Sequence, residues 1–159
     1  QRGFREATKN WIFYTDGDGQ FDFEEMAGVK PLLEQYDIAS CYRIARADSF
    51  MRKMNALAWT TLVNLLFRIR LRDIDCAFKF YPKSFIDAIE VHSTGALIDT
   101  EMLAKARNLG LSIGQMGVHH YPRTAGTQTG ANFKVILRAF RELFKRYRQI
   151  KSEGRRGKP

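Results

Sequence analysis

The sequence is poor in cysteine, histidine and proline, with two, three and four of these in 159 residues. Cys41 and Cys76 each lie among apolar or aromatic neighbours, and neither has a second cysteine or a histidine at the spacing of zinc ligands. We therefore expect two reduced thiols in the core of a cytoplasmic protein, with no disulfide and no zinc site. A domain of this length buries roughly 70% of its unfolded surface, so its core needs neither.

Long apolar runs and glycine-rich phosphate loops are also missing. The longest apolar run, Met54 to Phe67, contains two asparagines and is too short to span a bilayer, so it predicts a buried or interfacial helix. No signal peptide is visible, and neither GxxxxGK[ST] nor GxGxxG occurs. A phosphate ligand would therefore have to be held by other groups.

Most of the chain also lacks a charge excess. Residues 134–159 hold ten Lys/Arg and two acids, a charge of +8, which leaves 16 bases against 15 acids for residues 1–133. A near-neutral body with a basic tail is typical of proteins that bind a polyanion: a membrane surface, phosphates or nucleic acid.

Apolar runs and helical periodicities alternate along the chain, which predicts an α/β domain with a parallel or mixed sheet flanked by helices. We expect strands at 11–15, 37–44, 76–82 and 111–122. We expect helices at 2–9, 24–36, 49–69, 84–89, 100–109 and 131–150, with Gly110 closing the fifth and disorder from 151 to 159.

An acidic turn follows the first predicted strand, in "WIFYTDGDGQFDF". Residues i and i+2 of an extended chain share a side, so Asp16 and Asp18 can face one point, and a divalent cation would relieve their repulsion. An EF-hand is excluded, because Phe21 and Ala27 stand where its glycine and glutamate are required. A solvated acidic loop without a ligand stays open as the alternative.

The kind of cation suggests the kind of ligand. Oxygen ligands select Mg²⁺, Mn²⁺ or Ca²⁺, and Mg²⁺ is commonly bound by one or two carboxylates together with substrate phosphates. Because no phosphate loop is present, the metal would hold much of a diphosphate. This combination indicates a nucleotide-sugar enzyme rather than an ATPase.

Several further segments resemble one known family. "DGDGQFD" is similar to the DxDxQ motif of family 2 glycosyltransferases, and "YRIAR", "FMRK", "RDIDCAFKFY", "LIDTEML" and "HYPRTAGTQTG" follow in the family's order. The set resembles the dolichol-phosphate mannosyltransferase-like and polyprenyl-phosphate glycosyltransferase branch. The resemblance implies a GT-A fold and inverting transfer from a nucleotide-diphosphate sugar to a lipid-linked phosphate, with Mg²⁺ or Mn²⁺ as cofactor.

The resemblance also implies roles for single residues, which we expect as follows: metal ligands Asp16, Asp18 and Gln20; donor contacts Asp16, Arg43 and Arg52; acceptor-phosphate contacts Arg123 and Thr127. The family often shows Ser-Lys where this chain has Thr127-Gln128, a departure that bears on the acceptor. The family's first, base-binding strands would lie before Gln1. We therefore expect a fragment, residues 1–130 being the last two-thirds of a catalytic domain, with the activity belonging to a longer protein.

Three other acids are candidates for the reaction. Asp73 and Asp75 flank a strand start, and one of them is expected beside the sugar or the acceptor; the alternative is a salt bridge to Arg70 or Arg72. Glu101 opens a helix, where an acid also suits the helix dipole. A hydroxyl acceptor would need Asp75 or Glu101 as general base, whereas a phosphate acceptor is already anionic and needs none.

The terminal helix, residues 131–150, combines an apolar stripe with many cations. Phe133, Ile136, Phe140, Phe144 and other apolar residues recur at steps of three or four. Such a helix is typical of binding to an anionic membrane surface, so we expect a peripheral protein at the cytoplasmic face of a membrane. The alternative, packing on the core with a solvated outer face, is compatible with it.

Two other functions stay open. One is the same donor chemistry on a saccharide hydroxyl. The other, from a different class, is a nucleic-acid-binding module using the basic tail. We expect no nucleic acid, because the aromatic residues of the tail fall on its apolar stripe rather than among its charges.

Overall fold

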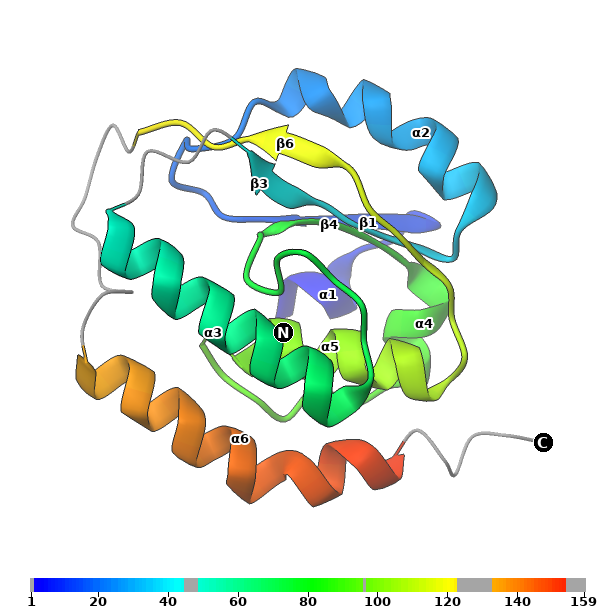
Figure 1. Ribbon diagram of the computed structural model, residues 1–159. Helices are drawn as coiled ribbons and strands as arrows, with labels where there is room; N and C mark the ends of the chain where they lie inside the picture. The colour runs from blue at the N-terminus through cyan, green and yellow to red at the C-terminus, as the bar shows by residue number, and fades with distance from the viewer. Residues whose placement is uncertain (1, 45–48, 96, 123–132, 154–159) are drawn as a thin grey trace.

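The protein is described by a computed structural model for residues 2–44, 49–95, 97–122 and 133–153 (Figure 1). The elements are α1 Arg2–Glu6, β1 Trp11–Thr15, a 3₁₀ turn Phe23–Glu25, α2 Met26–Gln35, β2 Ile38–Ser40, β3 Tyr42–Ile44, α3 Phe50–Phe67, β4 Phe78–Pro82, α4 Lys83–Ala88, α5 Leu97–Asn108, β5 Ile113–Gly114, β6 Gly117–His119 and α6 Phe133–Glu153.

The main sheet is mixed, as predicted, with strand order β1-β4-β2-β5. β4 pairs antiparallel with both β1 and β2, and β2 pairs parallel with β5. β3 and β6 form a second, parallel pair. The predicted strands 37–44 and 111–122 are therefore each two short strands, because the chain passes from one sheet to the other near Cys41 and again between β5 and β6.

A close approach of backbone and ring accompanies this crossing. A Cβ added to Gly114 would lie 2.6 Å from the ring of Tyr36. No other residue type fits there without a shift of the ring. Period-2 alternation cannot show such a crossing, because each half still alternates.

The sheet has a core on each face, and the alternation of side chains in β1 and β4 divides them. Ile12 and Tyr81 pack towards α4 and α5, whereas Phe13 and Phe80 pack towards α2, with their ring centroids 4.7 Å apart. A third cluster joins α3, α5 and α6. Figure 1 shows α2 on one side of the sheet and α3, α5 and α6 on the other.

Helix ends follow from local sequence. The Oγ of Ser49 accepts a hydrogen bond from the backbone N–H of Arg52 and caps α3. Gly110 has φ +83° just beyond α5, as its position after the predicted helix indicated. Within the described residues α6 runs to Glu153, three positions past the predicted end of the terminal helix.

Candidate active site

Topology brings the predicted acids to one edge of the main sheet. Thr15, the last residue of β1, lies opposite Phe78, the first residue of β4. Ser40 at the end of β2 lies opposite Lys79. The loop after β1, the chain leaving β2 and the loop entering β4 therefore meet at this edge. They carry Asp16 and Asp18, Arg43, and Asp73 and Asp75 respectively.

The turn after β1 is held from inside. Oδ1 of Asp18 accepts the backbone N–H of Gln20 at 3.2 Å, and Gly19 between them has φ +71°. The side chain of Gln20 is buried, and its Nε2 donates to the carbonyl of Tyr121 at 2.8 Å. The amide that was predicted as a metal ligand thus ties this turn to the end of β6, while Asp16 is exposed. The role of Gln20 as a metal ligand stays a prediction.

Neighbouring groups shift the pKa of the Asp16 carboxyl. Partial burial of this carboxyl raises its pKa most, the charges of Asp18 and Asp99 raise it further, and Lys79 and Arg43 act in the opposite direction. The two aspartates of the turn are therefore close enough to repel each other. This is the arrangement that the i, i+2 spacing predicted.

Arg43 and Asp73, both predicted to contact substrate, contact each other. The Nε and Nη2 of Arg43 donate to the two carboxylate oxygens at 2.7 and 2.8 Å. Both side chains are less than a tenth exposed. The salt bridge foreseen as the alternative for Asp73 exists, but the predicted partners, Arg70 and Arg72, were wrong. A planar, bidentate pair of this kind fixes the edge of the site.

Asp75 is the most perturbed carboxyl of the site. Burial, followed by the charges of Asp99 and Asp73, raises its pKa to about 7. Its Oδ1 is buried and has no hydrogen-bond partner among the described residues. A buried carboxylate oxygen without a hydrogen-bond partner among the described residues, on a group with a strongly raised pKa, is typical of a functional position.

Two functional candidates went unrecognised in the sequence. Lys79 in β4 is fully buried, and its Nζ donates to Oδ1 of Asp99 at 2.6 Å and to the carbonyl of Ile74 at 3.0 Å. The charges of this pair act on both Asp16 and Asp75. A lysine inside the apolar strand "CAFKFYP" was the available signal, because a lysine buried in a strand needs a carboxylate.

Glu101 lies elsewhere. Its carboxylate accepts the backbone N–H of Ser93 at 2.7 Å and pairs with the buried Lys105 at 2.7 Å. Lys105 also pairs with Glu153 of α6 at 2.6 Å. Burial opposes the charge of Glu101, but Lys105 and Ser93 outweigh it and its pKa is lowered. This network joins α5 to α6, and Glu101 makes none of the contacts that define the site, which favours the structural alternative.

The remaining predicted residues divide into two groups. Arg52 lies in the first turn of α3 and is partly buried. Arg123 and Thr127 lie outside the described residues. Arg52, Arg123 and Thr127 therefore keep their predicted roles as predictions.

The residues present fit a divalent cation to a limited extent. No group of three or more His, Cys, Asp or Glu in the described part of the chain is arranged to hold a metal. Asp16 and Asp18, whose charges interact, and Oδ1 of Asp75, which has no hydrogen-bond partner among the described residues, offer oxygen donors only. That set fits Mg²⁺ or Mn²⁺ completed by substrate phosphates, and it does not fit a metal held by protein alone.

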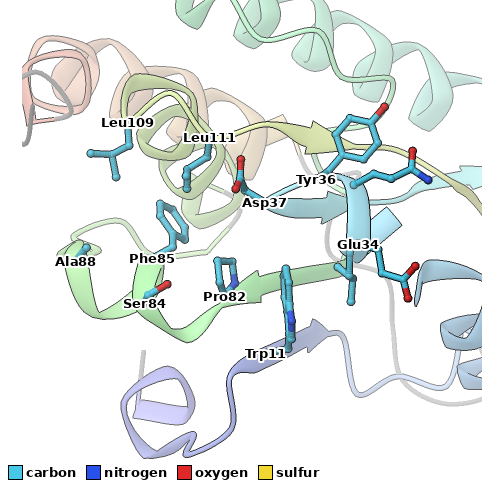
Figure 2. Close-up of a pocket in the computed structure, with 12 residues that line it drawn as sticks. Trp11, Glu34, Tyr36, Asp37, Pro82, Ser84, Phe85, Ala88, Leu109 and Leu111 are labelled. Carbon is cyan, nitrogen blue, oxygen red and sulfur yellow. The ribbon is translucent and has the colours of Figure 1, made fainter. Parts of the chain in front are cut away.

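A pocket lies at the opposite end of the sheet, between Trp11 and Pro82, which face each other across β1 and β4 (Figure 2). It encloses about 510 Å³. Asp37 lines it, but its carboxylate accepts the N–H and Oγ–H of Ser112, which lowers its pKa. The strongly perturbed acids are absent from its lining, so the acidic edge is the better candidate site.

The chain is similar to one protein in sequence and to another in fold. No family profile matches the chain. It is 28% identical over 131 residues to glycosyltransferase AglD of Haloferax volcanii, which covers 77% of this chain and 21% of that protein. It therefore spans about a fifth of that relative's length.

The structure resembles glucosyl-3-phosphoglycerate synthase from Mycobacterium tuberculosis, determined in complex with phosphoglyceric acid. The TM-score is 0.59 with 13% identity, over 96% of this chain and 51% of the other. The likeness confirms the predicted GT-A fold, a mixed sheet flanked by helices. The chain is thus similar in sequence to a glycosyltransferase and similar in fold to glucosyl-3-phosphoglycerate synthase.

Proposed function

We propose that this chain belongs to an inverting glycosyltransferase that moves a sugar from a nucleotide-diphosphate sugar to a polyprenyl or dolichyl phosphate. The observation that carries the proposal is the acidic edge of the sheet. There, Asp16 and Asp18 repel each other at the end of β1 and a partner-free Asp75 oxygen lies in the adjoining loop. The similarity to a glycosyltransferase, and the order of the motifs, support the same activity.

Asp16 and Asp18, with Gln20 at the base of their turn, would hold Mg²⁺ or Mn²⁺. The bound cation would neutralise charge on the departing nucleotide diphosphate. Arg52 would add a guanidinium to the same phosphates. Arg43 holds Asp73 in place through its two hydrogen bonds, so its first effect is to position that loop.

The acceptor supplies the nucleophile. An oxygen of the lipid phosphate attacks the anomeric carbon from the side opposite the diphosphate, the bond from that carbon to the diphosphate oxygen breaks, and the configuration inverts. The attacking oxygen is already anionic, so no protein base takes a proton. Arg123 and Thr127 would contact this phosphate, and α6 would keep the enzyme at the cytoplasmic face of an anionic membrane.

A second acceptor class is favoured by one observation. Burial and like charge give Asp75 a pKa of about 7, which suits a general base at neutral pH. With a saccharide or other hydroxyl acceptor, Asp75 would take the hydroxyl proton as the oxygen attacks. This version requires activity that rises with pH through about 7.

The experiment is a transfer assay on the full-length protein with labelled nucleotide sugars, run in Mg²⁺, in Mn²⁺ and with chelator. Polyprenyl phosphate, a soluble saccharide and phosphoglyceric acid are offered as separate acceptors. Transfer to the lipid phosphate that needs the cation supports the proposal. Transfer only to hydroxyl acceptors supports the second version, and no transfer from any common donor contradicts both.

A further inference from the structure

Helix α3 carries apolar side chains on two opposite faces. Trp59, Val63 and Phe67 of one face are buried in the cluster shared with α5 and α6. On the other face, Phe50, Met54, Leu57, Thr61 and Leu65 recur at steps of three or four. A helix that only packs on its own core needs one apolar face. The second one requires a separate explanation.

This outer face is strongly exposed. Phe50 is 74% exposed, Leu57 58% and Leu65 76%. Of the thirteen large apolar residues that are exposed in the described part of the chain, five lie on α3. Scattered exposed apolar residues are ordinary, whereas a gathered set indicates an interaction surface.

Helix α6, which packs on the buried face of α3, carries further exposed apolar residues. Phe140 and Tyr147 of α6 contact Trp59 and Phe67 of α3, with ring centroids 5.3 and 5.4 Å apart. Two exposed residues, Leu137 and Phe144, are three or four positions from these contacts and so lie on the same side of α6. Figure 1 shows α6 lying beside α3. We define the α3–α6 surface by its exposed apolar residues: Phe50, Met51, Met54, Leu57, Leu65, Leu137 and Phe144.

Cations outnumber acids around the α3–α6 surface. The segment 49–72 contains no Asp or Glu and five cations, Arg52, Lys53, Arg68, Arg70 and Arg72. The two acids in the described part of α6 are both paired, Glu142 with Arg138 at 3.0 Å and Glu153 with Lys105. Arg141, Lys145 and Arg148 are exposed on the same helix.

The combination selects the partner. A second copy would bring cations against cations, which opposes association. RNA would be bound by cations interleaved with stacking aromatics, but the aromatic Phe50 and Phe144 are grouped here with aliphatic side chains. Apolar side chains ringed by Lys and Arg match the boundary between the acyl chains and the headgroups of an anionic bilayer. None of the described helices combines the length and hydrophobicity needed to cross a bilayer.

We propose that the α3–α6 surface is a membrane-insertion face, with the outer stripe of α3 as its main apolar contact with lipid. The inference extends the proposed function, because it names how the enzyme reaches a lipid acceptor. α3 begins six residues after Ile44, the end of the strand that carries Arg43. Arg52, a predicted donor contact, lies in the first turn of α3, so insertion of α3 places that arginine close to the headgroup layer. The terminal helix, which the sequence singled out for this role, supplies cations and the edge of the face.

Vesicle flotation of the full chain, without metal or nucleotide sugar, tests this. Vesicles of phosphatidylcholine alone are compared with vesicles holding about a third phosphatidylglycerol. Binding should require the anionic lipid. The double variant Leu57→Gln/Leu65→Gln should bind at least about tenfold more weakly, since two large apolar side chains lose their burial in lipid. Met26→Gln, at an exposed apolar position on α2, is the matched control and should bind as wild type does.

A charge series completes the test. Arg141→Gln/Lys145→Gln should weaken binding to anionic vesicles about tenfold or more, whereas Lys30→Gln on α2 should leave it nearly unchanged. Unchanged binding of the Leu57/Leu65 variant overturns insertion. Absence of vesicle binding also overturns insertion. In that case, binding to RNA would indicate a nucleic-acid surface, and dimers that the Leu65 change dissociates would indicate a contact between copies. Because no donor is present, vesicle binding without transfer contradicts only the proposed function, and transfer without vesicle binding contradicts only this inference.

Discussion

Asp75 and Glu101 are two carboxylates of one chain, both candidates for a general base on sequence, and the fold treats them oppositely. Glu101 is surrounded by donors, the N–H of Ser93 and the ammonium of Lys105, and its pKa is lowered. Asp75 is buried near other negative charges, which raises its pKa to about 7. Its Oδ1 has no hydrogen-bond partner among the described residues.

Glu101 is therefore a carboxylate that stabilises the fold, whereas Asp75 is one that a ligand would stabilise. A satisfied buried ion pair lowers the free energy of the folded state only relative to a broken pair. A carboxylate held near like charges costs free energy until a cation or a proton relieves it. The acidic edge of the sheet is therefore where stability and function oppose each other.

The largest effect is expected from removing the turn carboxylate. Asp16→Asn should lower transfer by the full-length protein roughly 100- to 1,000-fold, because the cation that neutralises the leaving diphosphate loses a ligand. Initial rates at saturating donor measure it. Asp87→Asn, at an exposed position paired with Lys83, is the control and should keep wild-type rates. Retained activity in Asp16→Asn would remove the turn from the reaction.

Glu101→Gln should cost about 3 kcal/mol of stability, since Lys105 would be left buried with one fewer negative partner. Chemical denaturation measures it. Because the folded pKa of Glu101 is lowered, this stabilisation is present above the ordinary Glu pKa and is lost as the pH falls through the folded value. Glu6→Gln, in an exposed i, i+4 pair with Arg2, should change stability by less than about 0.5 kcal/mol. Equal losses in the two variants would contradict the comparison.

Asp75→Asn should raise stability at pH 8 by on the order of 2 kcal/mol and leave it nearly unchanged at pH 4. The folded pKa of Asp75 is raised to about 7, so the folded state binds the extra proton and wild-type stability falls between about pH 4 and pH 7. Denaturant midpoints across this range measure it. A variant equally stabilised at both pH values would show that packing, not charge, is the cause.

The smallest effect is expected from the metal. Millimolar Mg²⁺ or Mn²⁺ should raise the free energy of unfolding by about 1 kcal/mol, which corresponds to a concentration several times the dissociation constant. A thermal-shift series measures it. Asp16→Asn should abolish the shift and Asp87→Asn should keep it. A shift unchanged by Asp16→Asn would place the cation elsewhere.

Much of the fold was predictable from local pattern. The strand Trp11–Thr15, the long helix Phe50–Phe67 and the cap at Gly110 lie where periodicity and turn chemistry indicated. The division of residues 37–44 between two sheets was not, because a strand that changes sheets keeps its alternation. Nor was the burial of Leu143 and Ile150 in α6, with Phe144 left exposed. Several faces of α6 carry apolar residues, and which face is buried depends on the helices that pack against it.

The candidate site was predictable where residues are adjacent in sequence and unpredictable where they are distant. Spacing alone indicated that Asp16 and Asp18 lie close enough to repel each other, which their charges do. The pairing of Arg43 with Asp73, and of Lys79 with Asp99, joins residues 30 and 20 positions apart. The sequence offers each of these residues several possible partners of opposite charge, so it does not determine the pairing.

By itself the sequence determined the alternation of strands and helices, the acidic turn, and the basic, apolar character of α3 and α6, because these depend on neighbours along the chain. Only the tertiary structure decided which carboxylates pair with a cation, which carboxylate oxygen has no hydrogen-bond partner among the described residues, and which apolar face of α3 is covered. Burial and charge pairing depend on distance in space, and the fold sets that distance.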